Sequence, residues 1–219
     1  MFSAPLLPSD VQEPAELLEK IRARRPKGEL LNLDRKLLNS APFCQGWSIL
    51  CGNVRSKLLA LCSHTMELAI LTTAVVNQVP YEYLHHVGPY LDSSKEGEEE
   101  RALNQVAFLQ ATLACSDSDG SSLLESALFN DDEKLVIKIA AAMSAFDTSD
   151  VARGTTRTLL ATFESRHGAT ATTELVGAIS TYNMVGRFLV YCDVQPEREW
   201  EIAAEEVVKA FKTKRSLWS

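Results

Sequence analysis

The feature that most limits how this chain can fold is a long apolar segment, residues 58–79, which ends at Pro80. Proline lacks a backbone N–H and fits the first turn of a helix, so Pro80 either ends one helix or opens the next. His64, Glu67, Asn77 and Gln78 interrupt the segment. They favour a buried amphipathic helix over a membrane span, and we expect that central helix over residues 56–77.

Helical periodicity also dominates the rest of the chain, and strand alternation bounded by turn residues is missing from the sequence. We therefore expect an all-α fold. Besides the central helix, helices are expected over residues 15–25, 30–39, 80–91, 101–115, 122–129, 151–166, 171–193 and 196–214, and from Asp131 or Asp132 to Ala145. Residues 1–14 carry three prolines and are expected to form an extended arm.

Composition narrows the class of protein. The chain has 219 residues, 46% of them hydrophobic, which suits one large domain or two small halves with a real core. Its net charge of −7 argues against nucleic acid and anionic membranes as main partners.

Cysteine usage bears on the redox environment. The five cysteines are Cys44, Cys51, Cys62, Cys115 and Cys192, and no two of them form a CxxC pair. The number is odd, and a chain of this size does not need disulfides for stability. We expect free thiols in a reducing compartment, and therefore a cytoplasmic protein.

The densest chemistry in the sequence lies around Pro80, where Glu67 precedes it and Glu82 and His86 follow it. Glu82 and His86 are four residues apart and share one helix face. In a helical hairpin that turns near residue 79, Glu67 lies roughly 7–8 Å along the axis from His86 but about 13 Å from Glu82. Glu67 is therefore expected to pair with His86, and the three groups are candidates for proton transfer.

A structural role would also explain these residues. A Glu–His pair at this spacing stabilises a helix by about 0.2–0.5 kcal/mol, and Glu82 suits the positive end of the helix dipole. His85 points about 100° away from His86 and is expected to be structural. Because adjacent histidines do not share a helix face as paired zinc ligands do, no metal site is expected.

The residues from Glu67-Leu68 to Tyr81-Glu82-Tyr83 and His86 resemble the motif of the carboxymuconolactone decarboxylase family, which belongs to the all-α AhpD-like superfamily. A second stretch resembles longer members of that family, and it contains Glu174-Leu175, Tyr182-Asn183 and Arg187. The resemblance covers roughly residues 30–195. It implies an N-terminal arm and short helix at 1–29, a helical domain at 30–195 and a C-terminal helix at 196–219.

The resemblance also implies functional roles. His86 would be the proton shuttle, Glu82 would orient it or raise its basicity, and Glu67 would be the partner acid. Substrate binding would fall to Tyr81 and Tyr83, as oxyanion donors or as packing residues, and to Asn183 and Arg187, which share a helix face and could line the same pocket. Many members carry arginine before the first glutamate, where this chain has Met66; Arg55 or Arg187 could replace it.

Three functional classes remain open. The first is a cofactor-free lyase that acts on a small lactone or keto acid, or an isomerase or cyclase of a related metabolite. The second is a non-catalytic member that binds a ligand or assembles. The third is a thiol peroxidase, which is disfavoured because Val79 and Glu82 stand where redox members carry their two cysteines. A homo-oligomer is expected in each case, as a dimer, trimer or hexamer.

Overall fold

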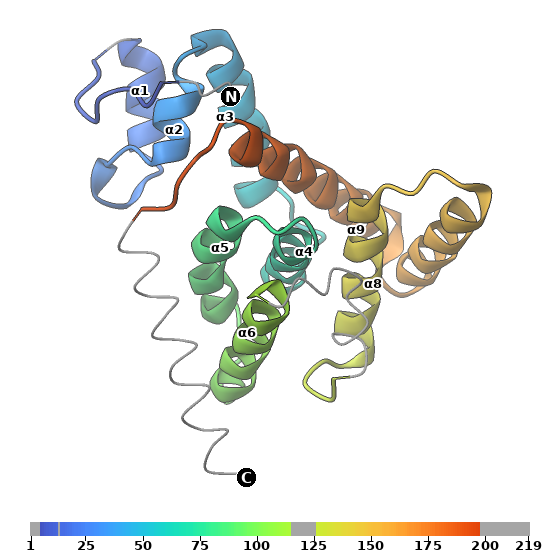
Figure 1. The fold of residues 1–219 in the computed structure, drawn as a ribbon. Helices are drawn as coiled ribbons and strands as arrows, with labels where there is room; N and C mark the ends of the chain where they lie inside the picture. Colours follow the sequence, from blue (N-terminus) through green and yellow to red (C-terminus); the bar gives the residue numbers. More distant parts are fainter. Residues whose placement is uncertain (1–4, 13, 115–125, 198–219) are drawn as a thin grey trace.

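A computed structural model describes residues 5–12, 14–114 and 126–197. Every regular element within those ranges is helical, as expected (Figure 1). The α-helices are α1 (Ala15–Arg22), α2 (Asn32–Leu37), α3 (Ala41–Ser56), α4 (Ser63–Val76), α5 (Pro80–Asp92), α6 (Glu99–Ala114), α8 (Asp131–Ala145) and α9 (Asp150–Tyr191), and a short 3-10 turn, η1, spans Pro26–Gly28. No helix in these ranges is long and apolar enough to cross a membrane.

Helix α4 forms the centre of the fold. It packs against α5, α6, α8 and α9, which surround it in Figure 1. Ten consecutive residues, 66–75, are buried, as a helix enclosed on every side requires. The hydroxyls of Thr72 and Thr73 donate to the carbonyls of Leu68 and Ala69, both at 2.8 Å, which satisfies them without breaking the core.

The central antiparallel pair of the prediction is α4 and α5. They are joined by a three-residue turn in which Gln78 adopts a left-handed backbone with φ 54°. Pro80 occupies the first turn of α5, where its missing N–H has no partner to lose. Because α4 and α5 pack against each other, the part of α4 that follows Glu67 lies beside the start of α5, which carries Glu82.

One predicted boundary in this region is wrong, and one helix was missed. The central helix begins at Ser63, because residues 57–62 form a connection, and α3 (Ala41–Ser56) was not predicted. The Glu174 carboxylate of α9 accepts hydrogen bonds from the backbone N–H groups of Leu59, Ala60 and Leu61, at 3.3, 3.0 and 2.7 Å. That long-range contact holds the connection out of a helix, and local periodicity cannot reveal it.

Other boundaries need smaller corrections. The cap of α8 is Asn130 instead of Asp131 or Asp132, since the Asn130 side chain accepts from the Glu133 N–H at 2.9 Å. Of the helix expected at 122–129, only residues 126–129 are described, and they are not helical. The predicted C-terminal helix lies almost wholly outside the described residues, as does Cys115.

Helix α9 has two arms that meet at Gly168, near the predicted break at His167-Gly168. Gly168 has φ 85° and ψ 164°, a conformation open essentially only to glycine. Figure 1 shows the arms running in different directions, with the second crossing the bundle toward α3. The second arm supplies buried residues such as Leu175 and Tyr182, whereas the first is mostly exposed.

Replacing Gly168 with alanine is expected to lower the free energy of unfolding by about 1–3 kcal/mol, because a Cβ strains this backbone conformation. The matched control is Gly154→Ala in the first arm, where a new Cβ would meet nothing within 4 Å. An alanine there is expected to be neutral or stabilising by up to about 1 kcal/mol, from helix propensity. Urea denaturation of both variants measures the contrast, and equal effects would contradict a strained bend at Gly168.

Candidate active site

His86 is the centre of a buried cluster of ionisable side chains. It lies on α5 with 5% of its surface exposed, and Glu67 reaches it from α4. Its Nδ1 lies 2.7 Å from Glu67 Oε2, which confirms the predicted pairing. Since a carboxylate only accepts hydrogen bonds, Nδ1 carries a proton and donates it to Glu67. The Nε2 atom is therefore the ring nitrogen that remains available for proton transfer.

Arg55 completes the cluster from the end of α3. Its Nη2 lies 3.2 Å from Glu67 Oε1. Its Nη1 is nearly equidistant from the two ring nitrogens of His86, 3.0 Å from Nδ1 and 3.3 Å from Nε2. That position lies over the face of the ring, because an in-plane atom at those distances would clash with Cε1. Arg55 thus supplies a guanidinium to the site, which Met66, the residue before Glu67, cannot do.

Glu82 stands at the other end of the imidazole. Its Oε2 lies 3.3 Å from His86 Nε2. The contact is not aligned as a hydrogen bond, and Oε2 has no hydrogen-bond partner among the described residues. Glu82 is only 4% exposed, so this oxygen is buried and unsatisfied. Such a group is expensive to maintain, and Glu82 helps to line a cavity.

The ionisable groups of the cluster shift one another's pKa. Burial opposes the charge on His86, but the carboxylates of Glu67 and Glu82 outweigh it and raise the pKa of the imidazole. Burial likewise opposes the charge on Glu67, but His86 and Arg55 outweigh it and lower the pKa of its carboxyl. The cluster therefore favours the charged forms of both His86 and Glu67.

These pKa shifts predict how stability depends on pH. The pKa of folded His86 lies above the ordinary value of 6.5, so its contribution is complete below that pH and is lost as pH rises through the raised value. The pKa of folded Glu67 lies below 4.5, so its contribution is lost as pH falls through the lowered value. The free energy of unfolding is expected to decline on the alkaline side, and this decline should vanish in His86→Gln. Urea denaturation at several pH values tests this; an equal decline in the variant would contradict it.

A cavity of about 430 Å³ opens beside the cluster, between α3, α5, α9 and the η1–α2 segment. Glu82 and His86 line it together with Arg55, Cys51, Trp47 and Tyr182. The ring of Tyr182 meets His86 edge-on, with the ring centres 4.8 Å apart. The sequence analysis did not select Tyr182, although it lies beside the selected Asn183.

The two predicted tyrosines have different surroundings. Tyr81 lines the cavity, and its hydroxyl donates to Glu197 Oε1 at 3.3 Å. Tyr83 is 1% exposed and its hydroxyl donates to the Val106 carbonyl of α6, so it belongs to the core. His85 lies at the cavity rim, where its Nε2 is 2.7 Å from Glu197 Oε2. Of the two tyrosines, only Tyr81 lines the cavity and is placed to contact a ligand there.

Asn183 and Arg187 do not line the cavity beside His86, contrary to expectation. Asn183 is buried and accepts a hydrogen bond from Asn77 at 3.0 Å while it donates to Ser144 at 3.1 Å. Both residues line a different cavity on the opposite side of α9. The expectation failed because Tyr182 and Asn183 are neighbours on a helix and point about 100° apart.

Cys51 is the thiol that lines the cavity, and burial raises its pKa to about 12. Burial likewise raises the pKa of Cys44, on the same helix, to about 11. Seven residues separate them, roughly 10 Å along α3, too far for a disulfide. These thiols are protonated and poorly nucleophilic at neutral pH. Within the described ranges, no three side chains group as ligands for a metal.

Comparison with known proteins supports the fold. No family model and no curated protein matches the chain. Among solved structures it is similar to an uncharacterized peroxidase-related protein from Silicibacter sp. TM1040, with a TM-score of 0.64, 13% sequence identity, and coverage of 90% of this chain and 93% of the other. The likeness confirms the predicted all-α, AhpD-like fold, and at this identity it extends to the fold alone.

Proposed function

We propose that this protein is a cofactor-independent acid–base enzyme, a lyase that removes CO2 from a small lactone or keto acid. One observation carries the proposal: a buried imidazole, oriented through Nδ1 by Glu67, lies within 3.3 Å of an unsatisfied Glu82 oxygen at the wall of a cavity. A structural histidine would satisfy its partners. A general acid–base site keeps one group free for the substrate.

In the proposed reaction, the substrate carboxylate lies next to a conjugated carbonyl group. The C–C bond to the carboxylate breaks, CO2 leaves, and the electron pair moves onto the carbonyl oxygen. Arg55, which lines the cavity, stabilises this developing negative charge. His86 then donates its Nε2 proton to the carbon that lost CO2. The neutral imidazole that remains takes up a proton from solvent before the next turnover, and Glu82 stabilises the imidazolium that forms again.

An isomerase would use the same residues, with Glu82 taking a proton from one carbon and His86 returning one to another. The unsatisfied Oε2 of Glu82, a residue that lines the cavity, suits that reaction equally. A disulfide-cycling peroxidase is disfavoured, because the cavity cysteine, Cys51, has a raised pKa and lies a full seven residues from Cys44.

The test is turnover of a panel of small lactones and β-keto acids in D2O. CO2 release is followed by gas analysis and the product by NMR. A lyase of this mechanism releases one CO2 for each product, and the product carries one deuteron at the carbon that had borne the carboxylate. Deuterium incorporation without CO2 release identifies the isomerase. Neither signal from any member of the panel, with the protein folded, would contradict an acid–base enzyme for these substrates and favour a ligand-binding role.

A further inference from the structure

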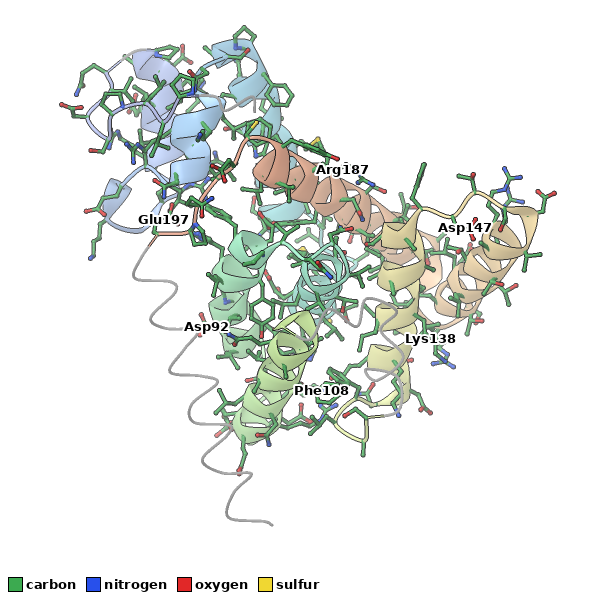
Figure 2. All side chains as sticks on the ribbon, viewed as in Figure 1. Asp92, Phe108, Lys138, Asp147, Arg187 and Glu197 are labelled. Atoms are coloured by element: carbon green, nitrogen blue, oxygen red, sulfur yellow. The ribbon has the colours of Figure 1, made fainter. Side chains whose placement is uncertain are left out.

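A second and larger cavity, of about 730 Å³, lies away from His86, between the C-terminal end of α8 and both arms of α9. Its walls include Met143 and Phe146 of the α8 end, Arg153 and Arg157 of the first arm, and Asn183 and Arg187 of the second. Asp147 and Arg187, labelled in Figure 2, mark the loop side and the second-arm side of this region. The volume is within the range of about 300–1,000 Å³ that is usual for small-molecule sites.

The cavity concentrates positive charge in a chain whose net charge is −7. Arg153 is paired with Asp150. Arg187 donates only to the Asn183 carbonyl, at 3.1 Å, and Arg157 has no hydrogen bond or ion pair within the described ranges. The acidic member is Asp147, which accepts the Ser149 N–H at 2.9 Å. Two guanidiniums therefore face the cavity without a carboxylate partner.

The opposite wall is apolar. Ala142 and Met143 come from the last turns of α8, and Phe146, which caps that helix with a left-handed backbone, is 72% exposed. A large exposed aromatic side chain next to unpaired arginines is unusual for a surface that contacts only water. A ligand with an apolar body and an anionic head would cover the aromatic side chain and neutralise the arginines.

We propose that this cavity binds an amphipathic organic anion, a carboxylate or phosphate monoester carried on a short apolar chain. Arg157 and Arg187 would hold the head group, and Met143 and Phe146 would pack against the chain. The site is separate from the one beside His86, because Tyr182 and Val185 of α9 face that cavity whereas Asn183 and Arg187 face this one. The proposal does not depend on the lyase function.

Calorimetric titration of the full chain tests the proposal with four probes below their aggregation limits. Octanoate and octyl phosphate carry both features, octanol lacks the charge, and inorganic phosphate lacks the chain. We expect saturable binding of one octanoate or octyl phosphate per chain, and much weaker binding of octanol and inorganic phosphate. Whichever of octanoate and octyl phosphate binds more tightly identifies the preferred head group. Octanol binding as tightly as the anions, or no saturable binding of either anion, would overturn the proposal.

Variants locate the site. Arg157→Gln and Arg187→Gln are each expected to weaken binding at least about tenfold, through the loss of a charge-assisted hydrogen bond. Two matched controls should bind as wild type: Arg166→Gln, which makes the same charge change on the first arm, and Arg24→Gln, which lines the cavity beside His86. Unchanged affinity in the first two variants, or an equal loss in Arg24→Gln, would place the ligand elsewhere and overturn the assignment.

Discussion

Replacing Glu67 with glutamine is expected to lower the free energy of unfolding by about 3 kcal/mol, close to the loss seen when one partner of a buried ion pair is removed. Glu67 is 3% exposed and contacts both cations of the cluster, Arg55 at 3.2 Å and His86 at 2.7 Å. The amide keeps the shape of the side chain but removes its charge. Glu82 is then the carboxylate left beside the buried His86 and the partly exposed Arg55, and the pKa of His86 is expected to fall.

A double-mutant cycle shows whether the loss comes from stranded charge. The double variant Glu67→Gln with Arg55→Gln is expected to be less destabilised than the sum of its two single variants, because it removes the unpaired guanidinium. The control Glu16→Gln alters a fully exposed glutamate paired with Lys20, and its unfolding curve should match wild type. Strict additivity in the cycle would show that Glu67 and Arg55 do not act as a pair.

The part of this cluster that the sequence predicted follows from local geometry. Pro80 marks a helical hairpin, and the helix rise then places Glu67 within side-chain reach of His86, with Glu82 one turn before His86. No tertiary information is needed for those relations, because the three residues lie on two consecutive helices. The all-α fold and the break at Gly168 also follow from local signals. Helical periodicity predicts the fold, and the glycine predicts the break.

The rest of the site depends on contacts between distant segments. Arg55 reaches the cluster because the connection after α3 is held by Glu174 of α9, so its place could not be found from spacing. Tyr182 reaches it from the second arm of α9. The sequence offered one usable signal there, since Tyr182 and Val185 share a helix face. Choosing the polar neighbours Asn183 and Arg187 selected the wrong face of the same helix.

The two glutamates contact different nitrogens of the imidazole. Glu82 is expected to orient the imidazole or to raise its basicity, and it contributes to the raised pKa of His86. In the structure Glu67 binds Nδ1, and Glu82 Oε2 stays without a hydrogen bond at the Nε2 end. Spacing predicts which residues are near one another, but the ring nitrogen that each one meets depends on the side-chain rotamer.

His86→Gln is expected to reduce turnover of the substrate identified by the panel by a factor of about 10²–10⁴, the usual contribution of a positioned acid or base. Glutamine fills a similar volume and can still donate to Glu67, so the fold and the cavity should persist. It cannot donate and recover a proton at neutral pH. The decrease should therefore appear in kcat, while the affinity for substrate stays close to wild type, as expected for an interaction made in the transition state.

Steady-state kinetics with a binding titration separates this role from a structural one. The control His167→Gln changes a histidine of α9 that does not line the His86 cavity, and it should keep wild-type turnover. Glu82→Gln should lower kcat as His86→Gln does, because its amide neither accepts a proton nor holds an imidazolium. The two defects should not add in the double variant, since His86 and Glu82 act on the same proton. Full turnover by His86→Gln would remove the imidazole from the mechanism and leave Glu82 with Arg55 as the reacting pair.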